Sequence, residues 1–144
     1  MKAVGRLLAA ATLLCLCALA AGALDLTEGR LRLTLYEGIG RFSLSYLSNS
    51  RESAYTPLLV AQDPRTTALS IVVGNKVHRL GEGSEFAQSV ERTPEGARFT
   101  WKSSLLTVSQ AFSFIASEGS TSATGIRIDV EVKNTSRQDL MVGL

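Results

Sequence analysis

The sequence predicts an all-β protein, an antiparallel β-sandwich preceded by an N-terminal signal peptide. Apolar and polar residues alternate with a period of two along several segments, which is the pattern of half-buried strands. Turn residues recur about every ten residues, and no segment after the leader shows an amphipathic helical period over three turns. We therefore expect a single domain over residues 24–144 with about nine or ten short strands.

The first 23 residues have the organisation of a secretory signal peptide. Lys2 and Arg6 form a basic start, and Leu7 to Leu19 is an apolar run without a charge. Small residues then occupy the positions that a signal peptidase requires. Cleavage is predicted between Ala23 and Leu24.

Two alternatives concern this leader. Ala18-Leu19-Ala20 offers an earlier cleavage site, and the uncleaved segment would act as a membrane anchor, although Leu7 to Leu24 is at the short end of what spans a bilayer. A lipid anchor is not expected, because leucine rather than a small residue precedes both Cys15 and Cys17. We expect an exported protein, periplasmic or extracellular, with no stable membrane span after cleavage.

The composition disfavours several classes of function. The chain has 15 Lys+Arg against 13 Asp+Glu, and the two become equal in number when Lys2 and Arg6 leave with the leader. No block of like charges remains, so we expect no nucleic-acid partner. A single histidine and no cysteine outside the leader also predict no metal, no cofactor and no catalytic residue, and the domain must depend on its apolar core.

Two segments near the start of the domain alternate strictly. Leu31, Leu33 and Leu35 are separated by polar residues, and the alternation resumes from Phe42 to Tyr46. Gly38-Ile39-Gly40 lies between them and resembles a glycine-rich phosphate loop, but no helix follows and the third glycine is missing. We interpret it as a bend or bulge between consecutive strands.

The following stretch predicts a loop, a short apolar run and a hairpin. Ser48 to Ser53 has the composition of a loop, and Pro57 opens an apolar run that ends at Ala61. Ala68 to Val73 is rich in β-branched residues and ends at Gly74-Asn75. This pair supplies the positive-φ residues that a tight hairpin turn needs.

A second hairpin and a long strand come next. Residues 86–91 and 97–102 flank Thr93-Pro94-Glu95-Gly96, where proline in the second position and glycine in the fourth suit a type I turn. From Leu106 to Phe114, large residues share one face of the predicted strand and small residues occupy the other.

The clearest strand runs from Ile126 to Lys133. Its isoleucines and valines alternate with charged residues, so we expect Ile128 to face the core and Glu131 to face water. The chain then turns into the apolar segment Leu140 to Leu144, which ends without a polar tail. We expect the chain to lack C-terminal partner strands and this segment to promote self-association through an unpaired edge.

Two side chains are candidates for ligand contact. His78 would need a carboxylate from Asp63, Glu82 or Glu85 to act in catalysis, and without one it is a histidine at the surface or rim. Trp101 would be either part of a sugar-stacking platform or a core residue, and we favour the core.

The C-terminal half carries a family resemblance. The charged-alternating strand and the apolar segment that join at Asn134 resemble the strand–turn–strand pattern of the galactose mutarotase-like supersandwich, and Phe99-Thr100-Trp101 with the segment from Leu106 to Phe114 is similar in layout. The resemblance implies a β-sandwich and transfers no activity, because the catalytic His and Glu of that family have no counterpart before Leu144. The whole chain is also similar to exported bacterial β-sandwich proteins.

The leading functional expectation is a non-enzymatic exported protein that binds another protein or a glycan at the cell envelope. The first alternative is a carbohydrate-active enzyme domain of mutarotase-like fold, which requires Trp101, His78 and an acidic residue to converge in a pocket. The second is an outer-membrane β-barrel segment, which needs strands of about 9 to 11 residues and girdles of aromatic side chains. Most predicted strands are shorter, and aromatic residues make up 6% of the chain.

Overall fold

The computed structural model describes residues 22–59 and 67–144, and these residues fold into eleven antiparallel strands with no α-helix. The all-β, sandwich-like prediction is confirmed. The predicted signal peptide up to residue 21, the end of the apolar run after Pro57, and Asp63 lie outside the described residues. The strands are β1 (Ala23–Glu28), β2 (Leu31–Tyr36), β3 (Arg41–Asn49), β4 (Ala54–Pro57), β5 (Ser70–Val73), β6 (Lys76–Arg79), β7 (Ala87–Thr93), β8 (Gly96–Lys102), β9 (Leu106–Ile115), β10 (Gly125–Asn134) and β11 (Val142–Gly143).

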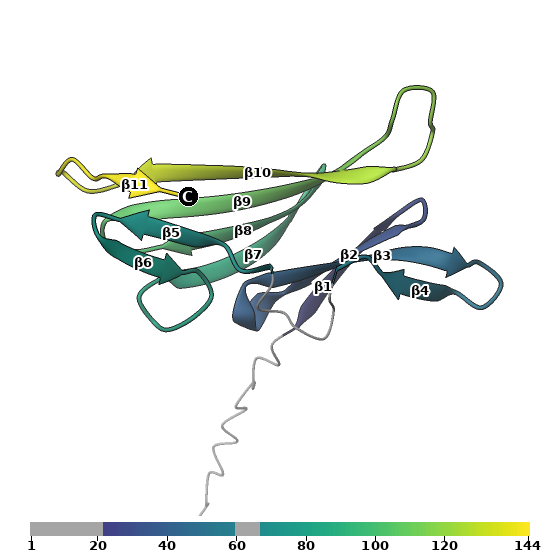
Figure 1. The fold of residues 1–144 in the computed structure, drawn as a ribbon, viewed down its shortest axis with the longest axis horizontal. Helices are drawn as coiled ribbons and strands as arrows, with labels where there is room; N and C mark the ends of the chain where they lie inside the picture. Colours follow the sequence, from purple (N-terminus) through teal and green to yellow (C-terminus); the bar gives the residue numbers. More distant parts are fainter. Residues whose placement is uncertain (1–21, 60–66) are drawn as a thin grey trace, which may run out of the picture.

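The strands form three sheets that make two layers. We call them the N-terminal sheet (β1-β2-β3-β4), the long sheet (β10-β9-β8-β7) and the small sheet (β11-β5-β6). The long sheet is one layer, and the other two sheets lie against different parts of it (Figure 1). This arrangement gives each sheet one apolar face to bury.

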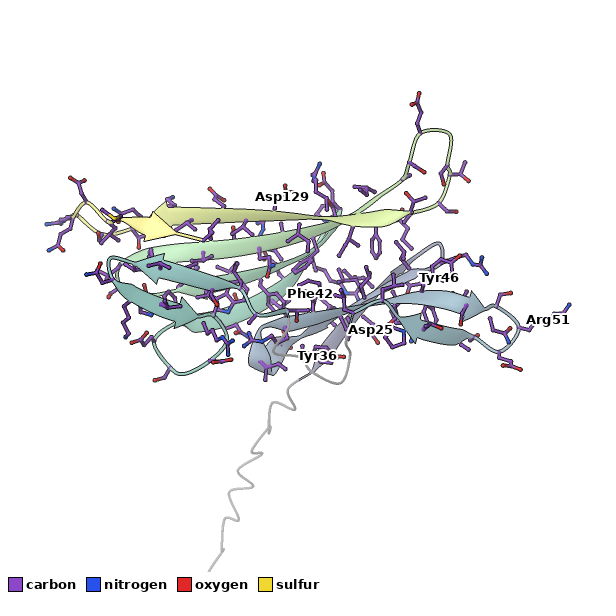
Figure 2. All side chains as sticks on the ribbon, viewed as in Figure 1. Asp25, Tyr36, Phe42, Tyr46, Arg51 and Asp129 are labelled. Carbon is purple, nitrogen blue, oxygen red and sulfur yellow. The ribbon has the colours of Figure 1, made fainter. Side chains whose placement is uncertain are left out.

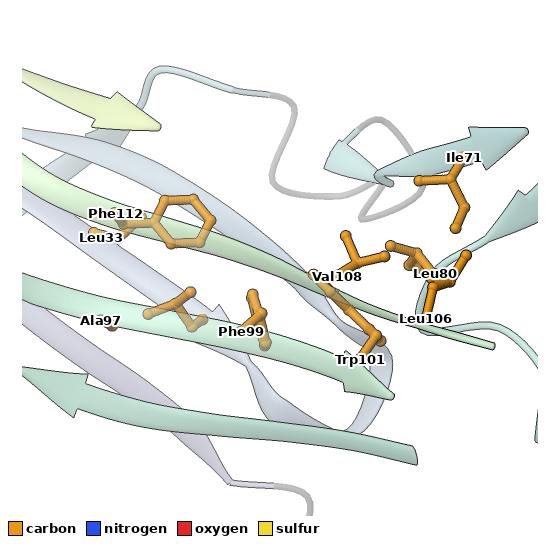
Figure 3. Close-up of a cluster of buried hydrophobic side chains, with 10 residues drawn as sticks. Leu33, Ile71, Leu80, Ala97, Phe99, Trp101, Leu106, Val108 and Phe112 are labelled. Carbon is orange, nitrogen blue, oxygen red and sulfur yellow. The ribbon is translucent and has the colours of Figure 1, made fainter. Parts of the chain in front are cut away.

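The core takes side chains from all three sheets (Figure 3). Alternation along β8 and β9 turns every second residue inward, and Phe99, Trp101 and Val108 have no exposed surface. Phe42 of β3 meets Phe112 of β9 edge to face, with ring centroids 4.9 Å apart. The buried residues of the cluster are Leu33, Leu35, Ile71, Leu80, Ala97, Phe99, Trp101, Leu106, Val108 and Phe112.

Both hairpin turns form where the sequence places them. Thr93 pairs with Gly96 across Pro94 and Glu95, and neither of these two has a positive φ, as a type I turn requires. In the first hairpin only Gly74 has a positive φ, at 59°. The prediction of two positive-φ residues there is therefore wrong, because a turn of type II′ needs only its first central residue to be glycine.

Two further boundaries differ from the sequence predictions, and one bend agrees with them. β3 continues to Asn49, which confines the loop to residues 50–53, and Pro57 ends β4 instead of opening a run. Pro57 is accepted there because β4 is an edge strand. The Gly-Ile-Gly motif is a bend between strands, as predicted, and takes the form of a 3-10 turn, η1 (Glu37–Ile39), capped by Gly40 at a φ of 58°.

The structure refines two predictions about the last strands. Ile128 lies on the inward side of β10 but remains 39% exposed, because β10 is the edge of the long sheet. Val142 and Gly143 of β11 pair with β5, which covers one side of the C-terminal apolar segment. The other side of β11 has no partner strand among the described residues, so self-association through it stays a prediction. Leu140 and Val142 also pack on the core, whereas Met141 is 81% exposed.

Candidate functional site

The single histidine of the chain stands on β6 beside a carboxylate. Lys76 and His78 are two residues apart on this short strand, so their side chains leave on the same face. The chain returns after β6 and brings Glu85 between them. His78 Nδ1 lies 2.6 Å from Glu85 Oε2, and Lys76 Nζ donates to Glu85 Oε1.

The electrostatics of this cluster favour the charged form of Glu85. The hydrogen bond from Lys76, and next the bond to His78, hold the pKa of the Glu85 carboxyl below its usual value of 4.5. Glu85 and Lys76 are more than half exposed, whereas the His78 side chain is 15% exposed. The imidazole also meets the Phe86 ring edge to face, at 5.6 Å between centroids. The carboxylate and the aromatic ring together fix the orientation of the imidazole.

A depression of about 480 Å³ adjoins the cluster. Its lining combines charged groups, apolar side chains and two serines. Its lining consists of Val73, Lys76, His78, Glu85, Phe86, Ser103, Ser104, Leu105 and Leu106. The site therefore offers hydrogen-bonding groups next to an apolar surface, which is the usual composition of a small-molecule site.

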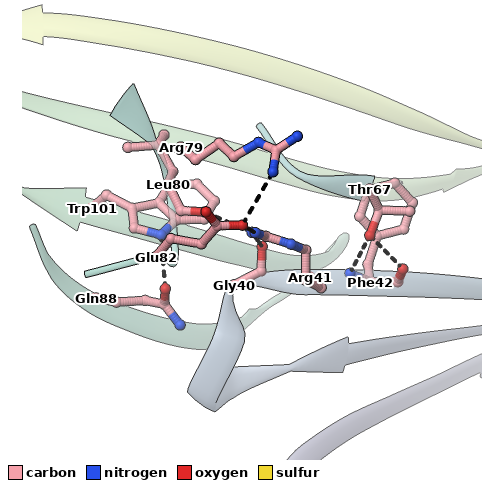
Figure 4. A network of polar contacts seen from close by, with 9 residues as sticks. All are labelled: Gly40, Arg41, Phe42, Thr67, Arg79, Leu80, Glu82, Gln88 and Trp101. Carbon is pink, nitrogen blue, oxygen red and sulfur yellow. Dashed lines mark hydrogen bonds and ion pairs between the residues drawn. The ribbon is translucent and has the colours of Figure 1, made fainter. Parts of the chain in front are cut away.

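A buried arginine from the other sheet anchors the segment that carries Glu85 (Figure 4). Arg41, at the start of β3, is 3% exposed, and its guanidinium donates to Leu80 O at 2.6 Å and to Glu82 Oε1 at 2.8 Å. Gly81 between these two contacts has a φ of 83°, and a Cβ there would lie 2.2 Å from Ile39 O. Only glycine allows this approach.

Trp101 is not part of this site. Its side chain is fully buried, its Nε1 donates to Gln88 Oε1 at 2.9 Å, and it does not line the depression beside His78. A ring without an exposed face cannot stack on a sugar in this conformation. Of the three carboxylates considered for His78, Glu85 contacts it, Glu82 binds Arg41, and Asp63 lies outside the described residues.

Sequence reasoning missed two contributors to the site. Lys76 had a signal, its two-residue spacing from His78 on a predicted strand. Arg41 had none, because a charged residue that begins an alternating strand is ordinarily expected at the surface.

A larger depression of about 630 Å³ lies where β1 approaches the turn between β7 and β8. Its charged side chains have mixed signs, and Arg92 Nη2 donates to Asp25 O at 2.8 Å. We place the candidate site in the smaller depression, because His78 and Glu85 line it within hydrogen-bond distance of each other, whereas the larger depression has no imidazole in its lining.

Within the described ranges, no helix has the length and apolarity needed to cross a membrane. Nor do three or more metal-ligating side chains gather anywhere in that part of the chain. No family model, no curated protein and no solved structure matches the chain. The similarity to mutarotase-like domains therefore stays a prediction.

Proposed function

We propose that the protein is an exported, non-enzymatic domain that binds a glycan or another protein at the cell envelope, with the His78 depression as its binding site. The leader sequence supports export. The observation that carries the binding role is that the Lys76–Glu85–His78 cluster and apolar side chains line the same depression. Its polar groups are oriented before any ligand arrives, which lowers the entropic cost of binding.

The chemistry of the depression favours a glycan over a peptide side chain. A sugar ring carries hydroxyl groups around its rim and C–H groups on its faces. The carboxylate of Glu85 and the imidazole of His78 are hydrogen-bonding groups for the hydroxyls, and Phe86 offers a partly exposed ring for a C–H face.

The test is an NMR titration of the purified chain with neutral disaccharides such as cellobiose and diacetylchitobiose. We expect amide shifts along β6 and residues 80–86. His78→Ala or Phe86→Ala should weaken binding about 5- to 30-fold, which corresponds to about 1–2 kcal/mol. Lys102→Ala, an exposed change on the opposite face of the long sheet, is the matched control and should have no effect. Shifts confined to another surface would refute the assignment of the site, and shifts with unstructured peptides alone would identify a protein ligand.

The pH dependence of binding supplies a second readout. Because the pKa of Glu85 is lowered, its carboxylate persists at and above pH 4.5 and becomes protonated only as the pH falls further. Protonation removes the acceptor that holds Lys76 and His78. Binding should therefore decline below pH 4.5, and Glu85→Gln should lack this acid limb.

One observation favours a second function, that of a carbohydrate-active enzyme. A carboxylate on Nδ1 of His78 is the arrangement that prepares the other ring nitrogen for proton transfer. Incubation with the sugars that bind separates the two functions. Product that forms with the wild type and not with His78→Ala indicates catalysis, and binding without product indicates a binding domain.

A further inference from the structure

β10 is a regular strand at the margin of the long sheet, and its outer side has no partner strand among the described residues. β10 pairs with β9 alone, from Gly125 opposite Ile115 to Asn134 opposite Leu106, with no shift of register. It contains no proline. In Figure 1 it forms the upper margin of the sheet, and its outer backbone N–H and C=O groups are available to another strand.

The side chains of β10 form two rows of different character. Arg127, Asp129, Glu131 and Lys133 are exposed on the outer face, where Asp129 is labelled in Figure 2. The inner row consists of β-branched aliphatic residues, and its member Ile128 is 39% exposed. An apolar side chain at a free edge is a surface that a second strand would cover.

We infer that a second copy of this chain pairs with β10 through its own β10, antiparallel, with the two-fold axis at Ile128. In this register Arg127 lies opposite Asp129 of the second copy, and Asp129 opposite its Arg127. In the inner row Ile128 meets its own equivalent and Ile126 meets Val130. Every charged pair at the centre is then of opposite sign, and every inner pair is aliphatic, which is the combination that stabilises cross-strand pairing.

The neighbouring symmetric registers bring like charges or polar residues together. An axis at Asp129 keeps the inner pairs aliphatic and sets Arg127 against Glu131, but it places Asp129 directly against its own equivalent. An axis at Val130 sets Arg127 against Lys133 and Asp129 against Glu131, so that all four cross-strand charge pairs repel. An axis at Val132 sets Val130 against the polar Asn134. A shift of the second copy by one residue would place its aliphatic row opposite the charged row. Directly opposite residues share one face of a sheet, so this shift would put charged side chains on the apolar face. The charge pattern thus disfavours full overlap and selects the shorter one.

The test uses two single charge reversals that are complementary only between copies. Arg127→Asp and Asp129→Arg each repel themselves in the proposed register and should raise the dimer dissociation constant at least about tenfold. Mixed in equal amounts, they restore both opposite-sign pairs between copies, although each chain has lost its own Arg127–Asp129 contact. Sedimentation over about 10 to 500 μM measures each variant and the mixture. Recovery in the mixture supports the interface. A monomeric wild type at the highest concentration, or a dimeric wild type without recovery in the mixture, overturns it.

A cysteine scan then fixes the register. In chains carrying Cys15→Ser and Cys17→Ser, the cysteine of Ile128→Cys faces its own equivalent across the axis and should form an intermolecular disulfide under mild oxidation. Val130→Cys and Val132→Cys are matched controls in the same row and should stay reduced. Cross-linking at either control position in preference to position 128 would refute this register.

Discussion

Arg41 is a charged side chain inside the protein, and the partners of its guanidinium explain why the fold accepts it. Its two terminal nitrogens bind the carbonyl oxygens of Gly40 and Leu80 and the half-exposed carboxylate of Glu82. The buried cation is therefore paired and hydrogen-bonded, as burial of charge requires. The same contacts join the N-terminal sheet to the segment that presents Glu85 to His78.

We expect Arg41→Met to lower the free energy of unfolding by about 2–4 kcal/mol, because it leaves buried carbonyls without donors. Arg98→Met is the matched control. Its guanidinium and Glu91 are both exposed and 3.5 Å apart, so the loss should stay within about 0.5 kcal/mol. Urea denaturation with an unchanged m-value measures both. Equal effects of the two variants would contradict the anchoring role of Arg41.

At the scale of elements, β9 and β10 have almost the same alternation and very different surroundings. β9 lies between β8 and β10, and its inward residues reach the centre of the core. In the part of the chain that the structure describes, β10 has a partner strand on one side only. We expect Val108→Asp to unfold the domain, since an isolated charge would replace a side chain with no exposed surface. Ile128→Asp should cost only about 1 kcal/mol, because the new carboxylate reaches water at the edge.

Thermal melts of dilute protein compare the two, with Glu131→Lys on the outer face as the control expected within about 0.5 kcal/mol. A loss for Ile128→Asp as large as that for Val108→Asp would show that the edge of β10 is covered.

At the scale of the whole molecule, the leader meets the fold at β1. The Ala23 that precedes the predicted cleavage point is also the first residue of β1, where it pairs with Tyr36, and Gly22 O accepts a hydrogen bond from Glu37 N. Cleavage after Ala20 would keep both contacts, and cleavage after Ala23 would remove them. If the predicted leader is cleaved, N-terminal sequencing of the mature protein should begin at Ala21 or Leu24. Intact Met1 in the membrane fraction would argue for a retained anchor.

Local pattern alone determined the fold class, most strands and both hairpins. Period-two alternation in β2, β9 and β10, and the Pro-Glu and Gly-Asn turns, are properties of neighbouring residues, and they are read without knowing what packs on them. The same logic places Trp101 in an alternating strand. Alternation does not say which strand lies at the edge of a sheet. Ile128 was therefore predicted to be covered like a residue of a central strand, whereas β10 lies at the edge.

The tertiary structure alone decided which polar residues meet. His78 and Glu85 come together because a seven-residue segment folds back over β6, and that path depends on Arg41, which lies in another sheet and far away in the sequence. Contacts of this kind arise from how the sheets pack. The alternation of residues adjacent in the sequence carries no information about them. The sequence thus determined the β-sandwich class, and the packing of the sheets decided that the single histidine of the chain contacts Glu85.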